Sequence, residues 1–111
     1  MKTFNEWLNE GRKVTNKWHA HISRVKCADG YSISIQASSG HYCTPRETIQ
    51  DAQHYLAFEL GYPSVADDVL IEHAEDAENP TDTVYPYVPR EVIEQVIASH
   101  GGIVGFDIKA A

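Results

Sequence analysis

The clearest pattern along the chain is the alternation of apolar and polar residues in the segment YSISIQAS. The segment WHAHISRVKC precedes it, and Asp29 and Gly30 between them suit a tight hairpin turn. The apolar residues of this first run change parity after Ile22, so we expect a bulge near Ser23 or Arg24. The second run places all its apolar residues on one face, which predicts the buried side of an antiparallel hairpin: Tyr31, Ile33, Ile35 and Ala37.

Helical spacing marks both ends of the chain. Phe4, Trp7 and Leu8 share one helical face, and Thr3 with Glu6 three residues later fits a capping box. Near the other end, the segment PREVIEQVIASH begins with Pro, carries a stripe of Val and Ile, and is followed by Gly. We therefore predict one helix at each end of the domain.

The middle of the chain is less regular. Residues 47–60 fit both a helix and a strand, and we predict a short helix or irregular start followed by a strand over about 54–60. The segment TVYPYVP predicts an edge strand, because Pro86 cannot donate to a neighbouring strand. IVGFD fits a last short strand.

These elements predict a single α+β domain over residues 1–111. An antiparallel sheet of three to five strands carries an N-terminal and a C-terminal helix packed on it. Residues 1–17 are expected to form the first helix and a basic connector, RKVTNK, and to be peripheral.

Acidic residues are concentrated in one part of the chain. Residues 47–89 carry ten acidic residues and no Lys or Arg, within a net charge of -7. The ordinary interpretation of such a stretch is a solvated loop. The sharper hypothesis is a rigid negative face that competes for a nucleic-acid-binding groove on a partner protein. Its expected contacts are Asp67, Asp68, Glu72, Glu75, Asp76, Glu78 and Asp82, with Tyr62, Tyr85 and Tyr87 as exposed aromatic anchors or, alternatively, core residues.

Histidine and cysteine residues raise the possibility of a metal site or an enzyme. His19, His21, His41 and Cys43 would form a zinc-binding set if both pairs met, but no zinc-type spacing is present, so we expect no metal and no cofactor. A metal- or thiol-dependent small enzyme that uses Cys43, His41 and Arg46 is the alternative function. We expect instead that Cys43 points inward and that Arg46 pairs with a carboxylate. Two cysteines are too few for a disulfide framework.

A second alternative is a nucleic-acid-binding module in the basic N-terminal half. Trp18 would stack on a base, and the overall negative charge argues against direct binding of this kind. The chain has no run of 18 apolar residues and no apolar segment of a secretory signal at its start, so we expect no membrane partner and a cytoplasmic protein. The basic residues of this alternative are Arg12, Lys13, Lys17, Arg24 and Lys26.

Several short motifs carry a resemblance: SIQASSGHYCTPRE, ELGYPS, PTDTVYPYVP and VIASHGGI. Together they span about residues 34–103 and resemble a group of small uncharacterised phage and prophage proteins with the pattern SxQAS, YCxPR, G[FY]PS, TVYxYVP and HGG. The resemblance implies that the protein is encoded by a phage or prophage and acts in the host cell cytoplasm. It does not imply a mechanism. Small acidic phage proteins of this kind are expected to act by stoichiometric binding. The expectation is therefore an anti-defence (anti-CRISPR-like) or host-takeover inhibitor of a nucleic-acid-handling complex.

Overall fold

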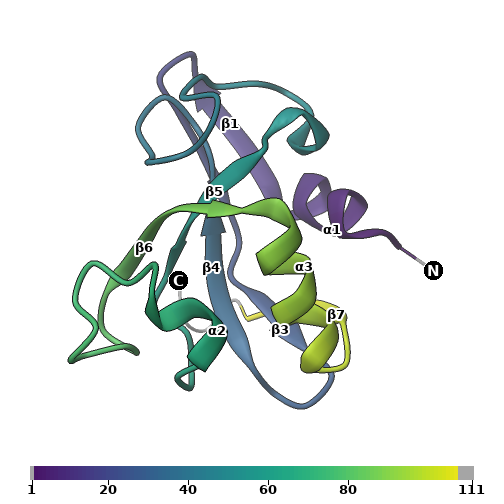
Figure 1. Cartoon of the computed structure of the whole chain (residues 1–111). Coiled ribbons are helices and arrows are strands. Elements are labelled where there is room, and N and C mark those ends of the chain that lie inside the picture. Colours follow the sequence, from purple (N-terminus) through teal and green to yellow (C-terminus); the bar gives the residue numbers. More distant parts are fainter. Residues whose placement is uncertain (1, 108–111) are drawn as a thin grey trace.

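The predicted hairpin lies at the centre of a five-stranded antiparallel sheet with the strand order β6-β5-β4-β3-β7. The computed structural model describes residues 2–107. A separate two-stranded sheet pairs β1 with β2 (Figure 1). The α+β class is as predicted, and the larger sheet has five strands, within the predicted three to five; the two-stranded sheet is additional. The strands are β1 (Arg12–Asn16), β2 (His19–Ile22), β3 (Val25–Cys27), β4 (Ser32–Gln36), β5 (Ala57–Gly61), β6 (Val84–Pro89) and β7 (Ile103–Phe106).

The helices begin where the sequence predicts. In α1 (Phe4–Gly11) the Thr3 hydroxyl accepts a hydrogen bond from Glu6 N at 3.2 Å, and the Glu6 carboxylate accepts one from Thr3 N at 2.9 Å. This capping box satisfies two amide groups that a helix start leaves without partners. The last long helix, α3 (Arg90–Ser99), follows Pro89 directly and packs across the sheet in Figure 1.

The alternation of β4 decides which residues form the core. Ile33 and Ile35 are completely or almost completely buried with the apolar residues of α3, whereas Ser32, Ser34 and Gln36 point to the other face. On that face the Gln36 side chain accepts from Ile22 N at 2.8 Å and donates to Ile22 O at 2.7 Å. One amide side chain thus joins the two-stranded sheet to the larger sheet. The first strand of the predicted hairpin is interrupted at Ser23 and Arg24, which separate β2 from β3. This is where the sequence predicts a bulge.

The basic segment after α1 was expected to be a connector, but it is a strand. Its residues form β1, which pairs with β2, and Arg12 donates hydrogen bonds to Ala37 O at 2.7 Å and to Ile49 O at 2.9 Å. A guanidinium group with several carbonyl partners fixes the segment to the domain. The side chains of β1 are mostly exposed and polar, so no apolar periodicity marks this strand in the sequence.

Residues 47–56 are mostly irregular, with one 3-10 turn, η1 (Ala52–His54), and the following strand begins three residues later than predicted. The edge position of β6 is confirmed, and β7 is the strand expected from IVGFD. The acidic stretch contains a short helix that was not predicted from the sequence, α2 (Asp68–Ile71). Leu70 of this helix is buried. Within residues 2–107 no helix combines the length and apolarity needed to cross a bilayer.

Candidate functional site

The acidic stretch forms α2 and a loop that returns to β6 (Figure 1). Asp67 is half-buried, whereas the side chains of the other six acidic residues are exposed: Asp68, Glu72, Glu75, Asp76, Glu78 and Asp82. The exposed carboxylates are therefore available to a partner, and Asp67 is committed to contacts inside the fold.

Hydrogen bonds hold the loop in one conformation. Glu75 N donates to Val84 O at 3.0 Å, which attaches the start of the loop to β6. The Asp76 carboxylate accepts from Glu78 N at 3.2 Å and from the Asn79 side chain at 2.9 Å. These hydrogen bonds attach the loop backbone to β6 and fix the Asp76 carboxylate within the loop.

The three tyrosines singled out by the sequence have different positions. Tyr62 and Tyr87 are about half exposed, at 49% and 48%. Tyr85 is completely buried, and its hydroxyl donates to Pro80 O, so the expectation that Tyr85 anchors a partner is wrong. Tyr85 and Tyr87 would share a face in a regular strand. They do not, because the register shifts opposite Phe58 and Leu60 and the backbone of Tyr87 turns out of the strand conformation.

Both exposed tyrosines have left-handed backbone conformations, with φ of 52° at Tyr62 and 53° at Tyr87. In residues 2–107 they are the only residues other than glycine with positive φ. The conformation costs an L-residue roughly 1–2 kcal/mol relative to the right-handed region, and glycine or asparagine adopts it more readily. Backbone contacts keep both in place, since Tyr62 N donates to Thr83 O at 3.0 Å and Tyr87 N donates to Tyr42 O at 3.1 Å.

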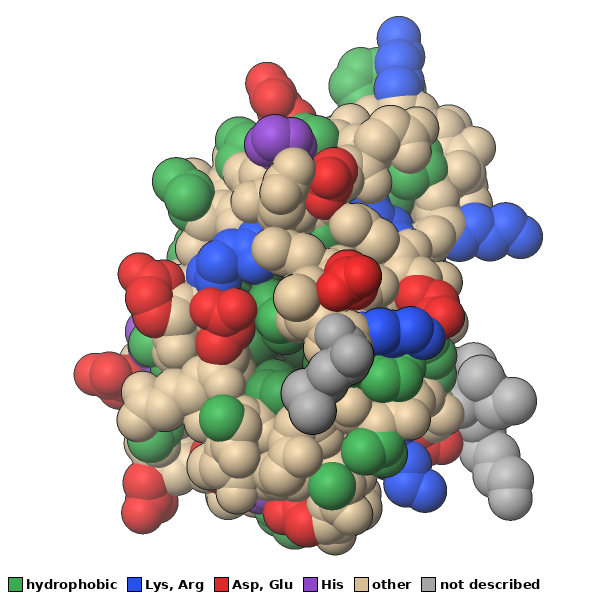
Figure 2. All heavy atoms as spheres, turned by 90° about the vertical axis from the view of Figure 1, so that its right-hand side faces the viewer, with side chains coloured by type: hydrophobic (Ala, Val, Ile, Leu, Met, Phe, Trp, Pro, Cys, Tyr) green, Lys and Arg blue, Asp and Glu red, His purple; other side chains and the backbone are tan. Residues whose placement is uncertain are grey.

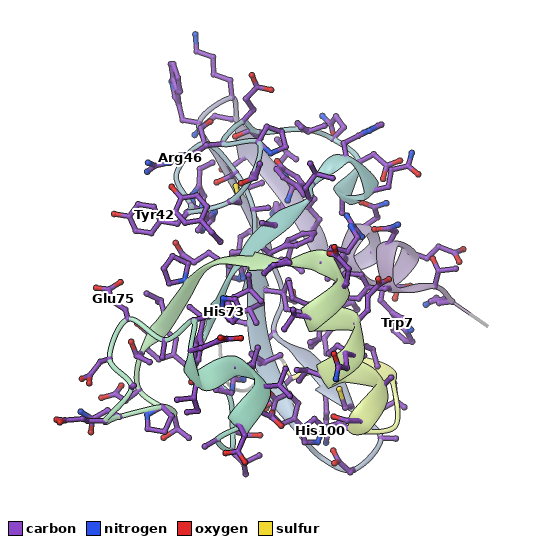
Figure 3. The ribbon with its side chains drawn as sticks, viewed as in Figure 1. Trp7, Tyr42, Arg46, His73, Glu75 and His100 are labelled. Atoms are coloured by element: carbon purple, nitrogen blue, oxygen red, sulfur yellow. The ribbon has the colours of Figure 1, made fainter. Side chains whose placement is uncertain are left out.

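A third tyrosine, which the sequence did not single out for binding, completes the group. The Tyr42 ring lies 5.9 Å from the Tyr87 ring, between centroids, and is 43% exposed. Figure 3 shows Tyr42, Arg46 and Glu75 on the same side of the molecule, away from Trp7. Main-chain hydrogen bonds attach Tyr42 and Glu75 to β6, and Tyr62 to Thr83 just before it. We call these tyrosines and the exposed carboxylates of the adjoining loop the tyrosine–carboxylate surface, defined by Tyr42, Tyr62, Tyr87, Glu75, Asp76, Glu78 and Asp82.

Arg46 does not pair with a carboxylate among the described residues, contrary to expectation. Its guanidinium lies over the Tyr42 ring, 4.9 Å from the centroid, and donates to Ser39 O at 3.2 Å. A cation over an aromatic face is a weak attraction at an exposed site. Arg46 thus orients Tyr42 at the margin of the tyrosine–carboxylate surface.

Two of the four residues considered as zinc ligands, His19 and His41, lie close together. The rings of His19 and His41 lie 5.4 Å apart, between centroids, and burial lowers the pKa of His41, with His19 and His21 acting in the same direction. Cys43 points inward and donates to Ser38 O at 3.3 Å. No group of three metal-ligating side chains is arranged for a metal ion within residues 2–107.

Cys43, the nucleophile of the enzyme alternative, is buried in the core. Burial raises the pKa of Cys43, which is the opposite of the shift that activates a catalytic thiol. The Nδ1 atom of His41 lies 2.7 Å from Ser38 Oγ, so the hydrogen bond of this ring goes to a buried serine. Cys43 therefore belongs to the core, as expected from its residue type.

Some of the basic N-terminal residues are engaged within the fold. Arg12 donates to carbonyl oxygens in the domain, and Arg24 donates to Ser32 and to Tyr62 O. Trp18 is 64% exposed, with Lys17 above its ring at 4.7 Å. Two of the five predicted phosphate-binding side chains are thus engaged within the protein.

Sequence reasoning missed a charged cluster around His100. Its Nδ1 lies 2.6 Å from Asp29 and its Nε2 lies 3.2 Å from Asp67, while the ring stacks on Tyr31 with centroids 3.8 Å apart. Although burial acts to lower it, the bonds to both carboxylates raise the pKa of His100. Both ring nitrogens are occupied, so this histidine has no free atom to act as a base. It connects the end of α3 to the hairpin turn and to the start of α2, at positions 71 and 33 residues apart in sequence.

Comparisons of this chain with protein-family models, curated proteins and solved structures find no match.

Proposed function

We propose that this protein acts by stoichiometric binding, and that its tyrosine–carboxylate surface covers a positively charged surface of a partner protein. The observation that carries the proposal is the conformation of Tyr62 and Tyr87. Two half-exposed tyrosines occupy backbone positions that disfavour them, one before and one after the acidic stretch in the sequence. Strained residues of this kind are concentrated at functional sites.

The composition of the surface matches what protein interfaces use. Tyrosine is enriched among the residues that dominate binding energy, because a rigid ring covers much area with little loss of side-chain freedom. The carboxylates of the acidic loop add attraction to Lys and Arg on the partner and speed its association. Exposed apolar rings next to a fixed negative loop therefore favour a basic protein partner over a small-molecule substrate.

The phage resemblance of the sequence supports a narrower version. We propose that the partner belongs to a host nucleic-acid-handling complex, with a CRISPR–Cas effector as the concrete candidate. Such complexes hold nucleic acid in positively charged channels. An acidic protein that covers such a channel would block DNA binding with a one-to-one dose dependence.

The experiment compares a double tyrosine variant with a single-residue control variant. Tyr62→Asn with Tyr87→Asn removes both rings and keeps a residue that tolerates left-handed backbone, so the fold is retained. Val104→Asn is the control, because Val104 is exposed on β7 at the opposite edge of the sheet. Immobilised proteins are exposed to host lysate, and captured proteins are identified by mass spectrometry.

We expect wild-type protein and the Val104→Asn control to capture the same basic partner, and the double tyrosine variant to lose it. Equal capture by the double tyrosine variant would contradict the proposed surface. For the narrower version, purified effector is titrated with the protein in a DNA-binding assay. Inhibition that saturates near equimolar protein supports it, and an unaffected effector excludes that target.

A further inference from the structure

The turn between β1 and β2 carries an exposed tryptophan on a fixed backbone. Trp18 is 64% exposed, although a ring of this size gains much from burial. Its backbone N donates to the Asn16 side chain at 2.8 Å. Ser39 Oγ donates to Lys17 O at 3.1 Å, which attaches the turn to the loop that follows β4. The fold therefore presents this ring to the solvent in a defined position.

Positive side chains surround the turn. Lys17 Nζ lies 4.7 Å from the centroid of the Trp18 ring. Lys13 is exposed on β1, and the exposed Arg46 donates to Ser39 O at 3.2 Å, so one serine holds both Arg46 and the turn. None of these three cations forms a salt bridge with a carboxylate among the described residues. Their charges are available to an anionic partner.

The outer face of the β1–β2 hairpin adds hydrogen-bond donors. Lys13 pairs with His21 across the two strands, and His19 lies two residues before His21, so these exposed side chains share one face. The pair formed by Val14 and Ala20 takes the inner face, where Ala20 is completely buried. An imidazole N–H can donate to a phosphate oxygen, as a lysine can.

The net charge of -7 does not decide what binds at this turn. Residues 11–28 contain no Asp or Glu, while Glu47, next to Arg46, is an exposed acid that offsets part of the local charge. Figure 1 shows the turn at one end of the molecule and α2 with the acidic loop toward the other end. Figure 2 shows basic and hydrophobic side chains projecting next to each other at the end that holds the turn. Exposed charges are screened over roughly 8 Å at physiological salt, so an anion at the turn responds mainly to the local cations.

We propose that the turn between β1 and β2 binds single-stranded nucleic acid. One base stacks on the exposed Trp18 ring, and Lys13, Lys17 and Arg46 attract the neighbouring phosphates. Stacking on an aromatic ring beside such cations holds single strands without sequence preference. Of the five basic residues in the alternative based on sequence, this site uses two, and it adds Arg46 from the loop after β4. Lys17 and Trp18 lie outside the tyrosine–carboxylate surface, so the site does not depend on the function proposed above.

Other anionic partners fit the turn less well. Membrane binding grows with the apolar area that is buried, and Trp18 is flanked by polar residues on both sides in the segment TNKWH. An acidic protein partner would need a packed apolar core around its anchor, which a single ring on a narrow turn does not provide. Duplex DNA keeps its bases stacked on one another, so it cannot use the ring.

The test measures the binding of a fluorescein-labelled twelve-residue oligothymidylate by fluorescence anisotropy. A matched oligonucleotide carries abasic spacers in place of the bases and keeps all the phosphates. We expect the oligothymidylate to bind at least fivefold more tightly than the spacer oligonucleotide, because only the former can stack. With three phosphate contacts, a rise from about 50 to 200 mM salt should weaken binding roughly twentyfold.

Three protein variants separate stacking from charge. Trp18→Ala should weaken binding of the oligothymidylate at least fivefold and leave its salt dependence unchanged. Lys17→Gln should reduce the slope of log affinity against log salt by about 0.7, the value for one phosphate contact on a single strand. Lys26→Gln is the matched control, because Lys26 is exposed on β3 of the larger sheet, and it should change neither quantity.

The proposal is overturned if the spacer oligonucleotide binds as tightly as the oligothymidylate, or if Trp18→Ala binds like the wild-type protein. It is also overturned if Lys26→Gln weakens binding as much as Lys17→Gln. Vesicles of phosphatidylcholine with phosphatidylserine, and polyglutamate, test the other anionic partners at the same salt concentration. Tighter binding of either one than of the oligothymidylate would assign the turn to that partner and overturn the proposal.

Discussion

Replacement of Gln36 by leucine tests how the two sheets are held together. The Gln36 side chain is 6% exposed, accepts from Ile22 N at 2.8 Å and donates to Ile22 O at 2.7 Å. Leucine has a similar size and no hydrogen-bonding atom, so Gln36→Leu leaves a buried donor and a buried acceptor of Ile22 without partners. Each such group costs roughly 1–3 kcal/mol, and some of this loss is offset by added apolar burial.

We expect the free energy of unfolding to fall by about 2–4 kcal/mol, out of the 5–15 kcal/mol typical of domains. Urea unfolding followed by tryptophan fluorescence measures this change. Hydrogen exchange adds a local readout, because the amides of β1 and β2 should exchange faster while those of β3 and β7 change less.

The matched control is Ser34→Ala. Ser34 Oγ accepts a 3.0 Å hydrogen bond from the same Gln36 amide, but its loss leaves both bonds to Ile22 intact. We expect a change below about 1 kcal/mol for this variant. The reasoning is refuted if Gln36→Leu is as stable as the wild-type protein, or if Ser34→Ala costs as much as Gln36→Leu.

Three further predictions concern single residues. Gly101 follows α3 with φ of 89°, so Gly101→Ala should lower the free energy of unfolding by about 1–2 kcal/mol in urea titrations, whereas Gly105→Ala, with open space around it, should change it little. Burial, assisted by the nearby Asp29, raises the pKa of Cys27 to about 11. Its thiol should therefore react with a thiol reagent at pH 8 roughly a hundredfold more slowly in native than in urea-unfolded protein. Equal reaction rates would contradict the buried position of Cys27. The pKa of His100 is raised, so its contribution to stability is full below its unfolded value of about 6.5 and is lost as pH rises through the folded value. The pKa of Asp29 is lowered by its bond to His100, so the contribution of that carboxylate to stability is lost at acid pH. The difference in free energy of unfolding between wild-type protein and His100→Gln should therefore be larger at pH 5.5 than at pH 8.5. An equal difference at both pH values would contradict the ion pair.

The parts of the fold that local rules govern were predictable from the sequence. The alternation in β4 gave its buried face, and the capping box at Thr3 and the proline before α3 gave the starts of two helices. The strand β1 was not predictable in this way, because its polar side chains show no alternation. What makes it a strand is pairing with β2 and the anchoring of Arg12, which depend on residues distant in sequence.

The candidate site divides along the same line. The exposed carboxylates followed from composition, and the buried position of Cys43 followed from residue type. The separation of Tyr85 from Tyr87 could not be read from spacing, because a regular strand places both on one face and only the left-handed Tyr87 breaks the rule. Likewise, His100 contacts Asp29 only because α3 packs against the hairpin, so no sequence motif predicts this contact.

The most direct test of the tyrosine–carboxylate surface is site-specific photo-crosslinking in a host cell. A photoreactive phenylalanine analogue replaces Tyr87 in one protein and Val104 in a second, and crosslinked proteins are identified by mass spectrometry. The account predicts that position 87 captures one basic partner and that position 104 does not capture it. The double variant Glu75→Gln with Glu78→Gln should reduce the capture. The control double variant on α3, Glu91→Gln with Glu94→Gln, should leave it unchanged. Capture of the same protein from both positions, or capture from position 87 that ignores the loop carboxylates, would contradict it.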